Sequence, residues 1–162
     1  MSIESDIEQM LEQEKLLRFK SFNADTAWEL GSLLRAEAMS RKATMTFEVQ
    51  LAGRVLFHAV TGEAPAGQAD WIRRKRNTVL RFGRSSYAMG RTLEHEGKTI
   101  EERHGLTLAD YAFHGGGFPL LIAGTGQVGS VVVSGLPQRE DHAMVVYAMA
   151  AIAGVSVPAL DD

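Results

Sequence analysis

Small and ionisable residues gather in two short segments of the C-terminal third of the chain, where their types and spacing suit a binding site. Consecutive glycines let the backbone approach another group closely, and their amide N–H groups can bind an anion. A helix start after the second segment adds amide donors, and a nearby histidine can act as acid or base. The candidate ligand-binding residues are His114, Gly115, Gly116, Gly117, Ser134, Gly135, Asp141 and His142.

These residues predict a pocket for a small ligand, with no metal site and no catalytic residue assigned. A second interpretation is that the three glycines only permit tight packing and that Asp141 and His142 only cap a helix. A pocket forms only if the two segments meet in space. The strands and helix that carry these segments therefore decide between the two interpretations.

Two apolar runs, 118–123 and 128–134, flank the connection Gly-Thr-Gly-Gln at 124–127 and predict a β-hairpin. Antiparallel pairing places the start of one strand beside the end of the other, so the glycine run should lie next to Ser134 and Gly135. Pro137 and the acids after it predict the start of the last helix. Both runs are too apolar to face water, so helices should cover both sides of the hairpin.

Two sequence motifs in this region are partial matches. Gly124-Thr-Gly-Gln-Val-Gly129 has the spacing of a dinucleotide-binding loop, but strand-like residues follow it where that loop needs a helix. His114-Gly-Gly-Gly117 matches the oxyanion-hole segment of some esterases, but no G-x-S-x-G elbow follows. A hairpin turn is therefore favoured for the first motif, and a serine triad is not expected.

Composition excludes several classes of function. The 162 residues predict a single domain, 1–162, which can bury a core without disulfides. The absence of cysteine excludes thiolate chemistry and is compatible with a reducing compartment. The first residues, MSIESDIEQ, are acidic and polar, unlike a secretory signal, so a cytoplasmic location is expected. A net charge of −3 argues against nucleic acid as a partner, and the lack of a long apolar run argues against a membrane span.

The first half of the chain predicts two helices, a hairpin and a third helix. Helix starts are expected near Ser5, which has a capping box, at Asn23 and at Asp70. Residues 44–51 alternate apolar and polar, which predicts a half-buried strand, and 54–60 should return as its partner. Together with the second hairpin, this order predicts an α+β fold with an antiparallel sheet.

The face on which His58 lies depends on the length of the connection between these strands. A two-residue loop at Ala52-Gly53 places His58 beside Phe47 and Val49, and one additional residue moves it to the other face. A lone histidine on a strand is more often structural than a ligand.

A basic stretch follows, with seven bases and no acid between positions 71 and 91. Four of them are consecutive, so on a helix they point around most of its circumference and cannot all share one solvent face. Three interpretations stay open: pairing with the acids of the first helix or of a neighbouring subunit, a solvated face, or contact with an anionic ligand or nucleic acid. The bases are Arg73, Arg74, Lys75, Arg76, Arg81, Arg84 and Arg91.

Almost the whole chain resembles the haem-degrading-domain superfamily, which is related to the glycolate-utilisation protein G, and within it the uncharacterised-protein-family (UPF) branch. The segments that carry the resemblance are EQEKLLRFKSFNADTAWELG, DWIRRKRNTVLRFGRSSYAMG and GGGFP…VVVSGLPQREDH. The family pattern is GG-x-P before a strand, Ser-Gly after the next strand, and an acid at a helix start. The matching residues are Gly115, Gly116, Pro119, Ser134, Gly135 and Asp141.

The resemblance implies an α-β-α domain, homo-oligomers built from dimers, and haem as a possible cofactor. Three hypotheses for function follow. The first is a homo-oligomeric protein that binds a small anionic or tetrapyrrole ligand, with His114 as a suggested axial ligand of haem. The second is an oligomeric scaffold or adaptor without a small ligand. The third is an enzyme that modifies such a ligand, with His114 or His142 as acid or base.

Overall fold

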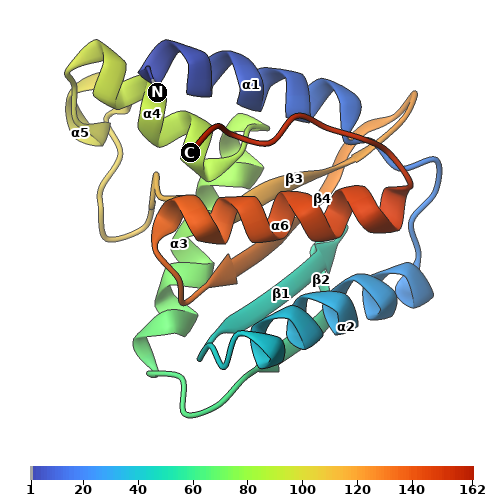
Figure 1. Ribbon diagram of the computed structural model, residues 1–162. Coiled ribbons are helices and arrows are strands. Elements are labelled where there is room, and N and C mark those ends of the chain that lie inside the picture. The colour runs from blue at the N-terminus through green and yellow to red at the C-terminus, as the bar shows by residue number, and fades with distance from the viewer. Residues whose placement is uncertain (1) are drawn as a thin grey trace.

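The computed structural model describes residues 2–162 and shows an α+β fold built on a four-stranded antiparallel sheet in the order β2-β1-β4-β3 (Figure 1). The strands are β1 (Thr46–Leu51), β2 (Arg54–Val60), β3 (Gly117–Ile122) and β4 (Gly126–Ser134). The helices are α1 (Ile3–Leu16), α2 (Ala24–Ser40), α3 (Gly67–Phe82), α4 (Ser86–Glu96), α5 (Ile100–His104) and α6 (Gln138–Ala153). Helices α2 and α6 cover one face of the sheet and α3 covers the other, as predicted (Figure 1).

Both predicted hairpins form, and pairing of β1 with β4 joins them into one sheet. The G-x-G-x-x-G motif lies at the turn between β3 and β4 and in the first residues of β4, so the interpretation as a hairpin turn is confirmed. The pairing of β1 with β4 could not be predicted from either hairpin alone, because it joins segments about 80 residues apart.

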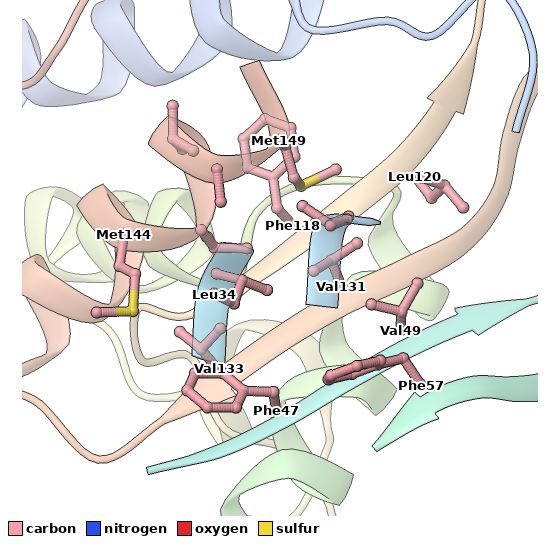
Figure 2. Packing of buried hydrophobic residues seen from close by; sticks show 14 of the residues in the cluster. Leu34, Phe47, Val49, Phe57, Phe118, Leu120, Val131, Val133, Met144 and Met149 are labelled. Carbon is pink, nitrogen blue, oxygen red and sulfur yellow. The ribbon is translucent and has the colours of Figure 1, made fainter. Parts of the chain in front are cut away.

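The main hydrophobic core lies between the sheet and helices α2 and α6 (Figure 2). Alternate residues of each strand point into it, as the two-residue period of a strand requires. β1 contributes Phe47 and Val49, which are fully buried, and β4 contributes Val131 and Val133. Burial of each of these side chains stabilises the fold by about 1.5–3 kcal/mol.

The opposite face of β1 is also buried, so the prediction of a half-buried strand is wrong. Thr46 and Glu48 are 3% and 5% exposed beneath α3. An Arg76 guanidinium nitrogen lies 2.7 Å from Glu48 Oε1, and this ion pair lets α3 cover a carboxylate. The polar alternation of the strand therefore marks a charged contact with α3 rather than a surface exposed to water.

A β-bulge decides the position of His58. The turn between β1 and β2 has two residues, but the register shifts between Val49 and Gln50. The shift pairs His58 with Glu48 instead of placing it on the core face beside Phe47 and Val49. An irregularity inside the strands thus has the effect that was expected of a longer loop.

The helix starts agree with the prediction at one of the three positions. Asn23 caps α2 and forms a capping box with Thr26. The cap of α1 is Ser2, whose hydroxyl accepts from the Ser5 N–H, so the predicted start near Ser5 is three residues late. Helix α3 begins at Gly67, and Asp70 is bound instead by arginines of the same helix.

Most of the basic stretch pairs with carboxylates of the same chain. Arg84 and Arg91 contact Glu14 and Asp6 of α1, so the expected pairing with the first helix is confirmed for these two. The other pairs are Arg73 with Asp70 and Asp110, Arg74 with Asp70, Lys75 with Asp141, and Arg76 with Glu48. The basic stretch thus joins α3 and α4 to their neighbours.

Helix α6 is buried on one side and exposed on the other. Its inner face packs Met144 and Met149 into the core (Figure 2), whereas Tyr147 is 60% exposed. Residues 155–162 run back along this helix toward α4 (Figure 1). Within residues 2–162, none of the helices combines the length and apolar character that a membrane crossing requires.

Candidate functional site

The two glycine-containing segments meet where the hairpin β3–β4 passes into α6. Gly117 pairs with Val132, and the Val133 N–H donates to the Gly116 carbonyl at 2.9 Å. The predicted juxtaposition of the glycine run with the end of β4 is therefore present. Beside it is a cavity of about 290 Å³, called here the His114 cavity, lined by Gln68, Trp71, Lys75, His114, Ser134, Gly135, Leu136, Gln138 and Asp141.

A buried ion pair lies at this cavity. Lys75 of α3 and Asp141 of α6 are 3% and 1% exposed, and Lys75 Nζ lies 3.2 Å from Asp141 Oδ2. The ammonium also donates to the Val133 carbonyl at 3.0 Å. The Asp141 carboxylate accepts from the Gly135 and Leu136 N–H groups at 3.3 and 3.0 Å. Asp141 thus joins α3 to the turn that starts α6.

The glycines serve close packing around this pair, as the second interpretation proposed. A Cβ at Gly116 would lie 2.3 Å from the Val133 carbonyl oxygen and 2.8 Å from Lys75 Nζ. Gly116 also has φ +129°, a conformation that side chains disfavour. A Cβ at Gly115 would lie 2.0 Å from the Gln138 carbonyl oxygen. Any larger residue would displace the backbone of β4 or α6.

The expectation that the glycine amides are free to bind an anion is wrong for three of them. The Gly115 N–H donates to Gln138 Oε1 at 3.2 Å, and the Gly117 N–H donates to Ser86 Oγ at 2.9 Å. The Gly135 N–H donates to Asp141. Side chains of α4 and α6 occupy these donors, so recognition in the cavity falls to side chains.

Burial controls the ionisation of the pair. It raises the pKa of the Asp141 carboxyl to about 6, although Lys75 and two amide N–H groups act in the opposite direction. Burial also lowers the pKa of Lys75, against the attraction of Asp141. Each group is therefore easier to neutralise than it would be in water, which is a property of many functional sites.

His114 is exposed at the rim of the cavity and contacts the Trp71 ring edge to face, with centroids 5.0 Å apart. Partial burial, together with the charges of Lys75 and Arg74, lowers the pKa of His114. The imidazole is consequently neutral at pH 7, and one ring nitrogen keeps its lone pair. Within residues 2–162, neither nitrogen forms a hydrogen bond or ion pair.

His142 does not join this cavity, although it follows Asp141 directly. It is fully buried, and its Nε2 lies 2.8 Å from Gln13 Oε1 of α1. Burial lowers the pKa of His142 to about 3, so it is neutral at physiological pH and unsuited to acid–base work there. Consecutive helical residues point about 100° apart, which separates Asp141 and His142 onto different sides of α6.

Five of the cavity residues were not among the predicted site residues. Trp71, Lys75 and Gln68 lie on α3, far from the hairpin in sequence. Leu136 lies just before α6, and Gln138 lies in its first turn. The sequence carried one signal for Lys75, because it belongs to four consecutive bases that cannot all face water. Nothing in the local pattern indicates that Trp71 would meet His114.

The fold and the cavity together define the class of protein. It is an α+β domain with helices on both faces of the sheet, and its cavity lies where a hairpin passes into a helix. The model of the family described as "Haem degrading protein HbpS-like" matches residues 22–150. The chain therefore belongs to the HbpS-like family, and the expected resemblance to the haem-degrading domain and to the UPF branch is confirmed.

Relatives cover nearly the whole chain. A UPF0303 protein of Serratia proteamaculans is 46% identical over 161 residues, which is 99% of both chains. A UPF0303 protein of Azotobacter vinelandii is 50% identical over 93% of this chain and 90% of its own. Among solved structures, the Ybr137w protein has a TM-score of 0.85 at 33% identity, over 93% of this chain and 90% of that one.

A more distant solved structure is that of the PduOC:heme complex. It has a TM-score of 0.69 at 15% identity and covers 87% of this chain and 99% of that one. At this identity the similarity shows the shared fold alone.

Proposed function

We propose that this protein binds a small ligand in the His114 cavity, and that haem is the ligand to test first. The observation that carries the proposal is the neutral His114 imidazole at the rim of a cavity lined in part by polar and charged side chains, with no protein partner among residues 2–162 for its ring nitrogens. A neutral imidazole with a free lone pair is a common axial ligand of haem iron.

Two further observations support haem. The family is described as haem degrading, and a protein of the same fold has been crystallised as a haem complex. The Trp71 ring beside His114 adds an aromatic surface against which a macrocycle can pack.

The size of the cavity limits how haem would be held. At about 290 Å³ it lies near the lower limit for small-molecule sites, which span ~300–1,000 Å³. Lys75 is already paired with Asp141 and is a poor partner for a propionate. A macrocycle would therefore be held at its edge, with most of its surface outside the cavity.

Haemin titration tests the proposal. The wild type should shift the Soret band saturably, and His114→Ala should weaken binding at least tenfold. His95→Ala is a matched control, because His95 is also exposed and lies on α4, outside the cavity. If no saturable shift occurs, or if both variants bind alike, haem ligation by His114 is refuted. A thermal-shift screen of small anions then tests the broader binding function, since a ligand of the native state raises stability.

We also propose that the protein forms homo-oligomers. Val55 and Val60 of the edge strand β2 are 52% and 48% exposed, and Trp28 of α2 is 67% exposed. Large exposed apolar side chains beside an edge strand are typical of an interface. Light scattering should give a multiple of 17.7 kDa, and Trp28→Glu should reduce it. An oligomer that binds no small ligand in either assay would favour the scaffold hypothesis.

A further inference from the structure

A second cavity lies on the side of α6 opposite the His114 cavity. It encloses about 480 Å³ between α6 and residues 155–160 of the C-terminal segment, and is called here the C-terminal cavity. Ala143, Ala150 and Ala151 line its helical wall, and Val155 and Val157 line the wall formed by the C-terminal segment. Small side chains on the helix leave the space open, and the walls are mainly apolar.

One buried polar atom of a residue that lines this cavity has no hydrogen-bond partner among residues 2–162. His142 lines the cavity, and its Nδ1 is buried without a hydrogen bond from residues 2–162. Gln13 Nε2 donates to the Pro158 carbonyl at 2.7 Å, so Gln13 Oε1 is the atom that faces His142 Nε2 at 2.8 Å. Nε2 therefore carries the hydrogen, and Nδ1 is an acceptor. A buried acceptor without a donor costs stability that a bound donor would restore.

The charges around the cavity exclude an anionic ligand. Arg139 is the basic residue of the lining, and its guanidinium is already bound by Asp6, the Tyr87 hydroxyl and the Asp161 carbonyl. Glu140 and Asp162 add negative charge. A ligand suited to this cavity is therefore neutral and mainly apolar.

We propose that the C-terminal cavity binds a neutral, mainly apolar molecule that carries one N–H or O–H group, which donates to His142 Nδ1. The alanines of α6 and the valines of the C-terminal segment enclose its apolar part. This site is independent of the His114 cavity, because the two are lined by different residues.

Two probes of equal size separate shape from hydrogen bonding. Indole has an N–H group, and benzofuran has an oxygen at the same position. Followed by ¹H–¹⁵N NMR on the wild type, indole should perturb residues 150–158 saturably and bind about tenfold more tightly than benzofuran, as one hydrogen bond allows. Lack of saturable indole binding, or equal binding of both probes, would overturn the proposal.

Variants locate the site. Ala151 is exposed and lines the cavity, so Ala151→Trp fills it with little effect on the core and should abolish indole binding. Ala24→Trp, at an exposed position on α2, is the matched control and should leave binding unchanged. His142→Phe removes the acceptor and should bring indole to the affinity of benzofuran. Indole binding that survives Ala151→Trp would place the ligand elsewhere and refute the proposal.

Discussion

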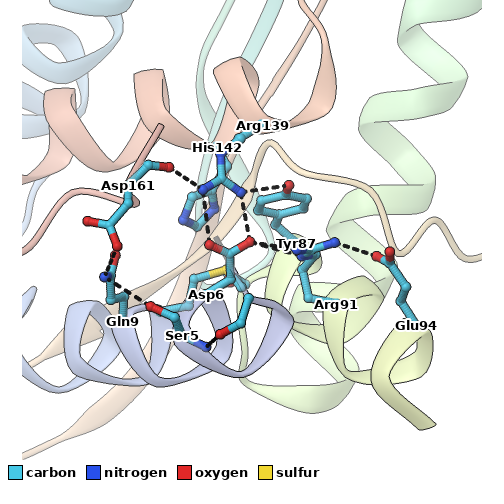
Figure 3. A network of polar contacts seen from close by, with 12 residues as sticks. Ser5, Asp6, Gln9, Tyr87, Arg91, Glu94, Arg139, His142 and Asp161 are labelled. Carbon is cyan, nitrogen blue, oxygen red and sulfur yellow. Dashed lines mark hydrogen bonds and ion pairs between the residues drawn. The ribbon is translucent and has the colours of Figure 1, made fainter.

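Two buried aspartates near the first turn of α6 have opposite electrostatic environments. Asp6 is 1% exposed, and Arg139 binds both of its carboxylate oxygens at 2.7 and 3.0 Å, while Arg91 binds Oδ2 (Figure 3). The hydrogen bonds and charge of Arg139, with those of Arg91, hold the pKa of Asp6 below its usual value. Asp141 is equally buried but has one cationic partner, and burial raises its pKa.

Two arginines favour the charged form of the Asp6 carboxyl, whereas at Asp141 the effect of burial outweighs that of the single cation. With Tyr87, the three charged residues Asp6, Arg91 and Arg139 form a clamp that joins α1, α4 and α6. The pair of Asp141 and Lys75 is less fully compensated and borders a cavity. We therefore expect the clamp to stabilise the fold and the pair to serve the site.

The largest expected effect is loss of the clamp. Asp6→Ala leaves two arginines without their shared partner and should lower the free energy of unfolding by about 3–5 kcal/mol. Urea denaturation measures the change, and Glu8→Ala, an exposed acid of the same helix, should change it by less than about 0.5 kcal/mol. Similar free energies of unfolding for Asp6→Ala and Glu8→Ala would show that the clamp does not stabilise the fold.

A smaller loss of stability is expected when the ion pair at the His114 cavity is broken. A second substitution should recover part of that loss. Lys75→Met leaves Asp141 buried without a cation and should cost about 3 kcal/mol. Adding Asp141→Asn removes the charge but keeps an acceptor for the amides of Gly135 and Leu136, so the double variant should recover at least about 1 kcal/mol. Urea denaturation measures the free energy of unfolding of both variants. A double variant that is less stable than Lys75→Met would argue against an uncompensated charge as the cause of the loss.

Replacing one glycine of the glycine run should lower the free energy of unfolding by about 2 kcal/mol. Gly116→Ala combines a positive φ with a Cβ that overlaps the Val133 carbonyl oxygen. Gly67→Ala is the control, because nothing lies within 4 Å of its Cβ and its φ is not positive, so no loss is expected. Thermal unfolding compares them. Equal melting temperatures would show that the backbone at Gly116 can move aside.

The smallest expected effect is on the pH dependence of stability. With rising pH the contribution of Asp141 to stability falls, whereas that of Asp6 grows. Because the pKa of Asp141 is raised from 3.8 to about 6, its contribution to stability is fully present below pH 3.8 and is lost as the pH rises through 6. Between pH 5 and 7 the wild type should lose about 1 kcal/mol relative to Lys75→Met/Asp141→Asn. Asp6, whose pKa is lowered, contributes above its unfolded pKa and loses that contribution as the pH falls.

Urea denaturation at several pH values measures both trends. A difference between the wild type and the double variant that is flat from pH 5 to 7 would show that Asp141 is already ionised at pH 5. Asp6→Asn should remove the loss on the acid side and leave the trend between pH 5 and 7 unchanged.

Much of the fold was predictable because its signals are local. Alternating residues predicted β1, and the glycines of 124–126 predicted a turn. The order of the elements predicted an antiparallel sheet, and the apolar runs of the second hairpin predicted helices on both of its faces. The meeting of the glycine run with the end of β4 also follows from local rules, because the two strands form one hairpin. The sequence by itself therefore determined the two hairpins, the family of the protein and the meeting of the glycine run with the end of β4.

Only the tertiary structure decided which side chains meet there. Lys75 is 66 residues from Asp141, and Trp71 is 43 residues from His114. Such contacts depend on how α3 and α6 are rotated against the sheet, and a rotation of one residue, about 100°, turns each helix to a different side. That rotation brings Asp141 to α3 and His142 to α1, because it is set by packing over the whole core and not by the residues beside each site.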